Sequence, residues 1–444
     1  MMAENHPSWA TRRWGQCVHK CPANLIFGAD SVNLNYPELR TNTLAAKQEI
    51  GYILSAMKRR VYFDHNATTP IAPEVWQVMT EAVANFGNPS SIHTFGREAK
   101  VALEGARERV ANFIGAKPSE IIFTSGGTEA DNLALFGVAS AFSHRGKHII
   151  ISQIEHHAVL ESAHHLVKQG FEVSYLAPTR DGIVLPEELV KAIRPDTVLV
   201  SIMAANNETG TIQPIAEVAK ITREKGILFH TDAVQMAGKR PINVSEFSVD
   251  LLSISAHKLY GPKGVGALCV RRGVKINPVL VGGGHEQNRR AGTENFVSII
   301  GFAKACEVAS RRMNEDEKKF AVLSEKLYRG LKEKVDDFRI NGSLERRLPN
   351  TLNISFPGID GEAVIVGLDM EGFAVASGSA CTSGATEPSH VLMALGLSKR
   401  EALGSIRVSF GRDNTDEEVD YFLSALPPIV ERLKALSKEI VEVK

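Results

Sequence analysis

The sequence predicts an α/β protein with a mostly parallel seven-stranded sheet in a large domain and a smaller α/β domain at the C-terminus. From about residue 97, apolar residues at helical spacing alternate with short β-rich runs. Strands bounded by helices in this way form parallel sheets that are covered on both faces. A long amphipathic stretch over roughly 297–335 then leads to a second, shorter alternation.

The elements of the large domain follow one another regularly. The helical pattern of residues 97–116 comes first, and the β-rich run EIIFT follows it directly. Two strands, 250–254 and 265–270, lie close together, so we expect them to pair as an antiparallel edge. Between these ends we predict helices at 128–142, 157–170, 186–194 and 214–225, and strands at 148–152, 172–176, 197–203 and 227–231.

The C-terminal section repeats the alternation on a smaller scale. The run TLNISF at 351–356 predicts a strand, residues 361–371 a helix, and GSIRVSF at 404–410 a second strand. The last residues, ERLKALSKEIVEVK, predict a charged amphipathic helix with a solvated outer face.

Residues 1–56 differ from the rest of the chain because they lack sustained periodicity. They hold no apolar segment of the kind found in signal peptides, and they are too acidic for a transit peptide. Met57 stands directly before the organised sequence KRRVYFDHNATTP. We therefore expect residues 1–56 to be either a mis-called upstream extension, with Met57 as the natural start, or a genuine flexible tail.

Composition narrows the class of protein. The 444 residues carry 51 Lys and Arg against 51 Asp and Glu, and this balance argues against a direct nucleic-acid partner. No apolar run approaches the roughly 18 residues that span a bilayer, so we expect no membrane partner. The five cysteines are an odd number, which leaves at least one free thiol. A free thiol fits a reducing compartment, and we expect a cytoplasmic enzyme.

The segment SISAHKLYGPKGVGAL, residues 253–268, carries the first candidate for catalysis. The apolar run LLSIS ends at Ser255, and Lys258 follows before a glycine-rich turn. A lysine sheltered in an α/β crevice is costly unless it is used. Its chemical use would be a Schiff base, which needs a nucleophilic amine. The alternative is a surface lysine in a turn.

Two further strand ends carry groups that suit the same chemistry. Asp232 follows the run ILFHT and could pair with a protonated pyridine nitrogen, although a capping role is the alternative. Residues 125–128, SGGT, join a strand to a helix, where glycines and helical N–H groups can receive a phosphate. An ordinary strand-to-helix turn is the alternative there. Together with Lys258, these parts favour a pyridoxal phosphate site.

Six motifs occur in an order that resembles the pyridoxal-phosphate-dependent cysteine desulfurases. They are SGGTEADNLAL, NNETGTIQPI, HTDAVQ, SISAHKLYGPKG, RRAGTEN and SGSACTSG. The resemblance runs from about Val61 to past Arg412 and is to the NifS and IscS branch of the class V aminotransferase relatives. It implies fold type I, the aspartate-aminotransferase-like fold. It also implies a large domain over 68–313 and a small domain, formed by 57–67 and 314–444, that carries the catalytic cysteine loop.

The resemblance implies a role for individual positions around the cofactor, pyridoxal phosphate. Lys258 of the SAHK motif would hold the cofactor covalently. Asp232 would bind the pyridine nitrogen, and Gln235 would meet the ring hydroxyl. His156 would stack on the ring and could shuttle protons. The phosphate contacts would come from Gly127, Thr128, Ser255 and His257, and from Thr293 of the partner subunit.

The substrate and the partners are implied in the same way. Asn207 and Arg407 match the residues that hold the substrate carboxylate in the family. Because Thr293 would serve the partner subunit, the resemblance implies a homodimer. The substrate would be L-cysteine, and the sulfur would pass on for iron–sulfur cluster assembly or another sulfur transfer. An iron–sulfur scaffold protein is the expected acceptor.

Cys381 lies in ASGSACTSGATEPSH, a run of small, flexible and polar residues. Glycines and serines on both sides predict a loop that can move, whereas burial is the usual fate of a free cysteine. The resemblance implies that cysteine is converted to alanine while Cys381 takes up the sulfur as a persulfide. Cys269, in the strand VGALCV, and Cys306, on an amphipathic helix, are predicted to be core residues.

Rival functions are separated by the same motifs. A selenocysteine lyase or a general class V aminotransferase are the rival enzymes, and an aminotransferase has no need for the SGSACTSG loop. A catalytically silent scaffold-binding protein is the rival from another class, and intact Lys258, Asp232 and Cys381 argue against it.

The segment HHAVLESAHH could suggest a metal site. His157, Glu161 and His164 would share one face of a helix, an arrangement that can bind zinc. A polar outer face with incidental histidines is the simpler interpretation, and we expect no metal.

Overall fold

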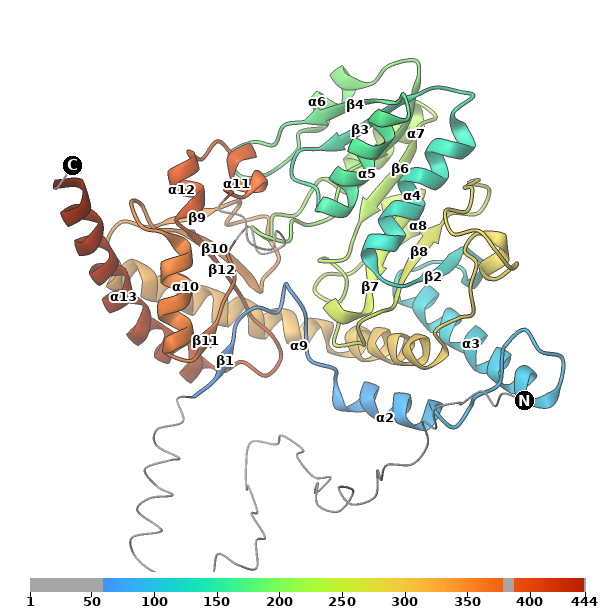
Figure 1. Cartoon of the computed structure of the whole chain (residues 1–444), viewed down its shortest axis with the longest axis horizontal. Coiled ribbons are helices and arrows are strands. Elements are labelled where there is room, and N and C mark those ends of the chain that lie inside the picture. Colours follow the sequence, from blue (N-terminus) through green and yellow to red (C-terminus); the bar gives the residue numbers. More distant parts are fainter. Residues whose placement is uncertain (1–58, 378–386, 443–444) are drawn as a thin grey trace, which may run out of the picture. The chain divides into compact units, whose positions relative to one another are not determined.

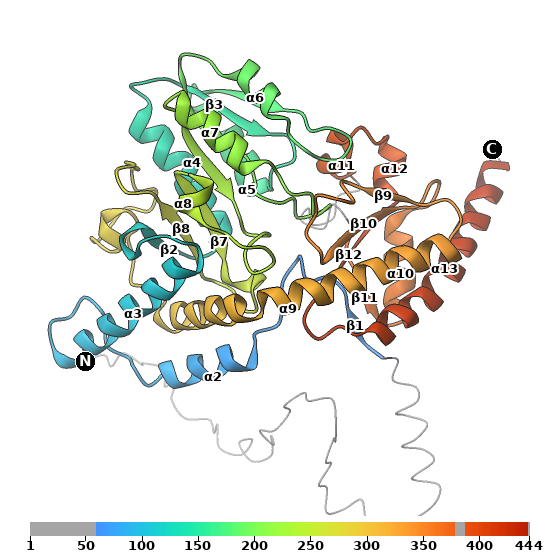
Figure 2. The same cartoon turned by 180° about the vertical axis from the view of Figure 1, so that it is seen from behind.

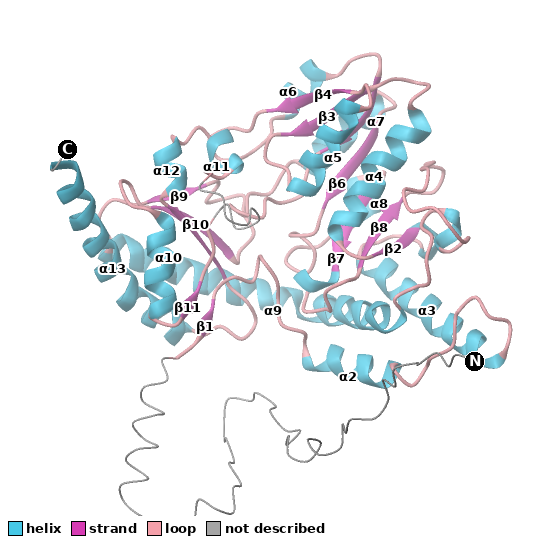
Figure 3. Cartoon of the chain, in the orientation of Figure 1, coloured by secondary structure: helices cyan, strands magenta, loops and turns pink. Residues whose placement is uncertain are grey.

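The computed structural model describes residues 59–377 and 387–442 (Figure 1). Seven strands form the main sheet, in the order β2-β8-β7-β6-β5-β3-β4. Helices and strands alternate along the chain, as Figure 3 shows. The strands are β2 (Ile121–Thr124), β3 (His148–Ser152), β4 (Glu172–Leu176), β5 (Thr197–Ser201), β6 (Leu228–Asp232), β7 (Leu251–Ser255) and β8 (Gly266–Val270).

The sheet is mostly parallel, which confirms the prediction. Strands β4, β3, β5, β6 and β7 run parallel to one another, and β8 is antiparallel to both β7 and β2. The predicted antiparallel pair therefore forms, but its placement at the sheet edge was wrong because β2 lies outside β8. A Cβ on Gly266 would lie 2.9 Å from Gly126 Cα, so the glycine allows this close approach.

Helices cover both faces of the sheet. In β3, Ile150 belongs to one core cluster, whereas Ile149 and Ile151 belong to another on the opposite face. Burial on both faces explains why the strands read as continuous apolar runs. Residues of α4 (Gly127–Phe142) and α5 (His157–Lys168) contribute to the core on the face of Ile149 and Ile151. The other core includes residues of α2 (Pro73–Ala82), α3 (Thr94–Phe113), α6 (Pro186–Ala192), α7 (Ile215–Glu224) and α8 (Val244–Phe247).

A third core, separate from the two on the faces of the main sheet, is built around two smaller sheets. The antiparallel sheet has the order β12-β10-β9, and β1 pairs in parallel with β11. Four phenylalanines pack at the centre of this core: Phe63, Phe373, Phe410 and Phe422. The ring centroids of Phe63 and Phe410 are 5.0 Å apart. The elements are β1 (Val61–Tyr62), β9 (Arg339–Asn341), β10 (Thr351–Ser355), α10 (Gly361–Met370), β11 (Phe373–Ala374), α11 (His390–Ala394), α12 (Lys399–Leu403), β12 (Ser405–Ser409) and α13 (Asp416–Glu442).

The long helix α9 (Phe296–Lys334) runs from the main sheet to the smaller sheets, as Figure 2 shows. Phe302 on its first half packs in one core of the main sheet, and Leu327 on its second half packs in the third core. The predicted helix over 297–335 is thus confirmed. The C-terminal helix begins at Asp416, well before the predicted charged segment, and contains two prolines.

Two further expectations concern the N-terminal segment and membrane-spanning helices. The predictions for residues 1–56 and Met57 lie outside the described residues. Across the part of the chain that the structure describes, no helix combines the length and apolar character needed to cross a membrane.

A buried ion pair fixes the loop between β8 and α9 to α3. Arg107 Nη1 and Nη2 lie 2.7 and 2.8 Å from the carboxylate oxygens of Glu286, which also accepts a hydrogen bond from Phe123 N. Glu286 has a φ of 45°, and the two residues that follow, Gln287 and Asn288, also have positive φ angles. This strained turn needs the ion pair to hold it in place.

We expect Arg107→Met to lower the free energy of unfolding by about 3–5 kcal/mol, because it leaves the Glu286 carboxylate buried without a partner. Urea unfolding followed by circular dichroism measures the change. Arg109→Met, at an exposed position two residues along the same helix, is the matched control and should change stability by less than about 0.5 kcal/mol. Equal effects of the two substitutions would contradict the assigned role of the pair.

Candidate active site

A cavity of about 310 Å³ lies where several strands of the main sheet end. Asp232 is the last residue of β6, Ser255 is the last residue of β7, and Gly127 begins α4 shortly after β2. In open α/β sheets, ligands bind at such strand ends. Ten of the residues that the sequence predicts for the site line this cavity: Gly127, Thr128, His156, Asn207, Asp232, Gln235, Ser255, His257, Lys258 and Arg407.

Among the predicted site residues that the structure describes, Thr293 is not one that lines the cavity. Thr293 is exposed and lies in the loop before α9. Cys381 lies outside the described residues, so its predicted role stays a prediction. Cys269 and Cys306 are buried, as predicted. Burial raises the pKa of both thiols, so neither is suited to act as a nucleophile.

The N-terminus of α4 forms a cup at one end of the cavity. A Cβ on Gly127 would lie 2.8 Å from Val234 Cγ2, so a larger residue would fill the cup. Ser255 Oγ is buried and has no hydrogen-bond partner among the described residues. An unpartnered hydroxyl beside the first N–H groups of a helix fits a phosphate group. His257 also lines the cavity, and its Nδ1 lies 3.1 Å from Thr68 Oγ1.

Two buried carboxyl groups lie deeper in the cavity. Asp232 is 6% exposed, and its Oδ1 accepts a hydrogen bond from Val234 N at 2.8 Å. Asp131 is 1% exposed, and its Oδ1 has no hydrogen-bond partner among the described residues. Burial raises the pKa of both groups, and for Asp131 the charge of Asp232 adds to the effect. A cationic ring nitrogen beside Asp232 would offset the cost of this buried charge.

Lys258 enters the cavity from a 3₁₀ turn, Ala256–Lys258, that follows β7 directly. Its Nζ donates hydrogen bonds to Asn66 O at 2.5 Å and to Ala67 O at 2.7 Å. Gln235 Nε2 donates to the same Asn66 O at 2.9 Å. The amine is therefore held by backbone carbonyls and faces the cavity that Asp232 also lines.

His156 caps the N-terminus of α5 and lines the cavity. Its Nδ1 accepts a hydrogen bond from Ala158 N at 3.1 Å. Burial lowers the pKa of His156 to about 4, and the charge of Lys258 adds to the shift. The ring is therefore neutral at pH 7, with its proton on Nε2. A neutral ring whose orientation is fixed by a cap is suited to stacking on a flat ligand.

Arg407 lies in the middle of β12, where it pairs with Asn353 of β10. Its guanidinium is 2.6 Å from Asp64 Oδ1 through Nη2, and Nη1 donates to Asn207 O at 3.1 Å. Arg407 Nε is buried without a hydrogen-bond partner among the described residues. This unsatisfied donor, in a cavity that Asn207 also lines, suits a ligand carboxylate.

Two polar residues of the cavity, Asn66 and Asp131, were not predicted from the sequence. Asn66 contributes its backbone carbonyl, which no side-chain pattern marks. Asp131 had a signal: it lies on α4 next to Ala130 and Leu133, which are both buried, and a carboxylate on an apolar helix face is unusual.

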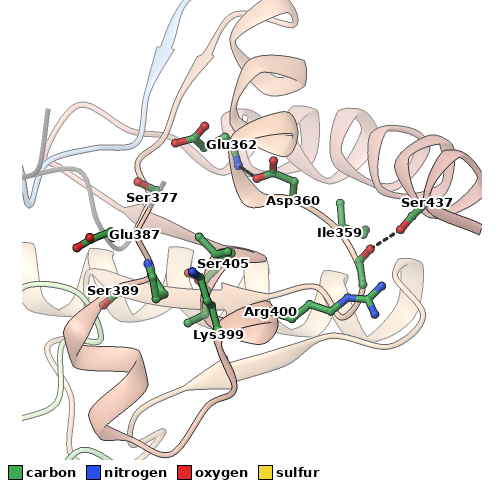
Figure 4. A pocket seen from close by; sticks show the side chains of 14 residues that line it. Ile359, Asp360, Glu362, Ser377, Glu387, Ser389, Lys399, Arg400, Ser405 and Ser437 are labelled. Atoms are coloured by element: carbon green, nitrogen blue, oxygen red, sulfur yellow. Dashed lines mark hydrogen bonds between the residues drawn. The ribbon is translucent and has the colours of Figure 1, made fainter. Parts of the chain in front are cut away.

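A larger cavity, of about 580 Å³, lies in the region of the third core and is drawn in Figure 4. Asp360 Oδ1 accepts a hydrogen bond from Glu362 N at 2.9 Å, and Ser437 Oγ donates to Gly358 O at 2.8 Å. None of the site residues predicted from the sequence is among the described residues that line it. Within residues 59–377 and 387–442, no group of three His, Cys, Asp or Glu residues is placed to hold a metal ion.

The chain is similar in sequence and in fold to known proteins. The model of the aminotransferase class-V family matches residues 61–422. Cysteine desulfurase IscS of Dictyoglomus turgidum is 53% identical over 382 residues, which are 86% of this chain and 97% of the relative. A solved NifS-like protein superposes with a TM-score of 0.80 at 44% identity, over 84% of this chain and 100% of that chain. The structure of SspA in complex with cysteine superposes with a TM-score of 0.70 at 37% identity, over 79% and 98% of the two chains.

Proposed function

The chain belongs to the aminotransferase class-V family, and from this premise we propose that it is a pyridoxal-phosphate-dependent cysteine desulfurase. It converts L-cysteine to L-alanine and transfers the sulfur to Cys381 as a persulfide. One observation carries the proposal: Lys258, Asp232 and the N-terminus of α4 converge on one cavity that Arg407 also lines. A lysine, a buried carboxylate, a phosphate cup and a carboxylate-binding arginine are the parts that this chemistry needs.

The residues present fit the cofactor. Ser255 Oγ and the N-terminal N–H groups of α4 would hold the phosphate, with Thr128 and His257 beside them. Asp232 would keep the ring nitrogen protonated, and His156 would stack on the ring. When bound, pyridoxal phosphate supplies an electron sink for the charge that develops at the substrate Cα.

The polar residues of the cavity bind and orient the substrate. Arg407 Nε would donate to the cysteine carboxylate while Asp64 keeps the guanidinium in place, and Asn207 would donate from its side-chain amide. This contact fixes the Cα–H bond of the substrate relative to Lys258. The Lys258 amine would then remove the proton from Cα. Structural relatives support the choice of substrate, since one of them is a complex with cysteine.

The sulfur step balances without an external oxidant. The Cys381 thiolate attacks the sulfur of the substrate, so an S–S bond forms while the Cβ–S bond breaks. The electron pair of the broken bond stays with the carbon, which takes up a proton and becomes the methyl group of alanine. The substrate carbon is reduced, and the two sulfur atoms are oxidised to the persulfide level.

The proposal extends to the domains and partners of the chain. The large cofactor-binding domain comprises 68–313, and the small domain comprises 57–67 and 314–444. The enzyme acts as a cytoplasmic homodimer in which Thr293 of the partner subunit contacts the phosphate. Exposed apolar side chains support a second copy, because Phe86 is 79% and Ile92 is 91% exposed. An iron–sulfur scaffold protein accepts the sulfur.

Product analysis tests the proposed function. The purified holoenzyme is incubated with L-cysteine, and alanine and sulfide are measured together. With an excess of a thiol reductant in the assay we expect equal amounts of the two, because each cleaved Cβ–S bond yields one alanine and one persulfide, from which the reductant releases one sulfide. In a single turnover without reductant, alkylation and peptide mapping should locate the persulfide on Cys381.

The control variants are Cys269→Ala and Cys306→Ala, which should retain the persulfide on Cys381 because both thiols are buried. Transfer of the amino group to a keto acid in place of alanine release would contradict the proposal and favour an aminotransferase. Cleavage of selenocysteine with no cleavage of cysteine would favour a selenocysteine lyase.

A further inference from the structure

Lys239 is a buried cation that the proposed reaction does not use. It lies in the turn that follows β6 and is 6% exposed. Its Nζ donates to Gln235 O at 2.9 Å and to Gln235 Oε1 at 3.3 Å. No described carboxylate lies within 4.0 Å of it, and it does not line the cavity. A buried ammonium without an acidic partner is costly, so its retention calls for a use.

The ammonium determines which way the Gln235 amide points. An ammonium can only donate hydrogen bonds, so the amide oxygen must face Lys239. The amide nitrogen then faces the other way, where it donates to Asn66 O at 2.9 Å. Because Gln235 lines the cavity, its second N–H is left for an acceptor there. With a neutral residue at position 239, the Asn66 carbonyl alone would set the orientation of the amide, which would then be held less firmly.

The charge of Lys239 also reaches the cavity. Asn66 O joins Gln235 Nε2 to Lys258 Nζ, so a chain of hydrogen bonds connects the two lysines. Burial lowers the pKa of Lys239 to about 7, and the charges of Lys258 and Arg407 add to the shift, so Lys239 is about half ionised at pH 7 and its ammonium form prevails below that pH. In turn, Lys239 contributes to the lowered pKa values of His65 and His257. Every charged group that faces Lys239 in this way is basic.

We propose that Lys239 is a positioning residue that holds Gln235 with its amide N–H toward the ring hydroxyl of the cofactor and favours the ionised form of that oxygen. The inference rests on the proposed function, since it needs pyridoxal phosphate in the cavity. A donor hydrogen bond and a nearby positive charge both stabilise an oxyanion. Lys239 acts through Gln235 and does not itself touch the ligand.

The test is a pH titration of the visible absorption of the bound cofactor, without substrate, in wild type and Lys239→Met. We expect the midpoint to rise by about one pH unit in the variant, because a positive charge that opposes protonation nearby is lost. We also expect kcat to fall about tenfold with KM changed less, since Lys239 does not line the cavity. Lys263→Met, an exposed lysine near Lys258 in sequence, is the control and should leave the midpoint in place.

The double variant with Gln235→Leu shows whether Lys239 acts through Gln235. We expect Lys239→Met to shift the midpoint less in the Gln235→Leu background than in wild type, because the part that acts through the amide is already lost; fully additive shifts would overturn the inference. An unchanged midpoint in Lys239→Met would also overturn it while leaving the proposed function intact. A wild-type chain without cofactor absorption would overturn both.

Two further measurements apply if Lys239→Met does not fold. Lys239→Gln removes the charge but retains an N–H donor, and it should still raise the midpoint. In a crystal structure of the wild-type holoenzyme, Gln235 Nε2 should lie within about 3.2 Å of the ring oxygen. An amide that makes no contact with that oxygen would overturn the inference.

Discussion

Lys258→Ala is expected to abolish desulfuration, with a loss of at least about 10⁴-fold in kcat. The substitution removes the group that would attach the cofactor and also the base that would move the Cα proton. The two histidines that line the cavity are poor replacements as the base, because burial lowers the pKa of His156 and His257 to about 4 each and so makes both rings weak proton acceptors. Sulfide and alanine release measure the activity, and visible absorption measures cofactor attachment.

Two further variants separate the possible causes of such a loss. Lys263→Ala changes an exposed lysine near Lys258 in sequence and should retain full activity. Cys381→Ala should retain the colour of the attached cofactor but release no sulfide, because only the sulfur acceptor is missing. If Lys258→Ala retained more than about a hundredth of wild-type activity, Lys258 would not be the base of the reaction.

The strand ends explain why so much of the site could be predicted from the sequence. Asp232, Ser255 and Gly127 each follow an apolar run that forms a strand of the same sheet. Parallel strands bring their carboxyl ends to one edge, so groups far apart in sequence must meet there. The residues at the strand ends, taken by themselves, left a surface lysine and ordinary turns as alternatives. The order of the six motifs then pointed to pyridoxal phosphate as the cofactor.

The parts that were missed depend on contacts between distant segments. Asn66 acts through a backbone carbonyl, and Asp64 reaches Arg407 from the other end of the chain. Nothing in the local pattern around either residue indicates such a partner. The edge position of β2 has the same origin, since its pairing with β8 joins strands that are more than a hundred residues apart. Periodicity predicts an element and its buried faces, but not its neighbour in the sheet.

Asp232→Asn is expected to lower kcat/KM by about 10²- to 10³-fold while the cofactor-free chain becomes no less stable. The activity falls because the buried pair between the carboxylate and the ring nitrogen is lost, and such pairs contribute about 3–5 kcal/mol. An asparagine cannot keep the ring nitrogen protonated, so the electron sink is weakened. Steady-state kinetics with L-cysteine measure the loss.

Asp232→Asn should make the cofactor-free chain more stable, because a buried Asp232 carboxylate is costly when no cationic ring nitrogen pairs with it. Burial raises the pKa of Asp232 and of Asp131, so the folded chain binds more protons than the unfolded chain above the ordinary carboxyl range. Stability therefore falls as the pH rises through that window, and at pH 8 the ionised Asp232 carboxylate destabilises the cofactor-free chain. The neutral amide introduced by Asp232→Asn would carry no such cost, and it would also relieve the repulsion on Asp131.

Thermal unfolding at pH 8, with and without pyridoxal phosphate, tests both parts of this argument. We expect Asp232→Asn to raise Tm of the cofactor-free chain and to reduce the further rise that the cofactor gives to wild type. Asp181→Asn, at an exposed position, is the control and should change neither value. A lower Tm of the cofactor-free variant would show that Asp232 holds the fold together. A carboxylate that opposes folding until a cationic ring arrives is one that the ligand, not the fold, requires.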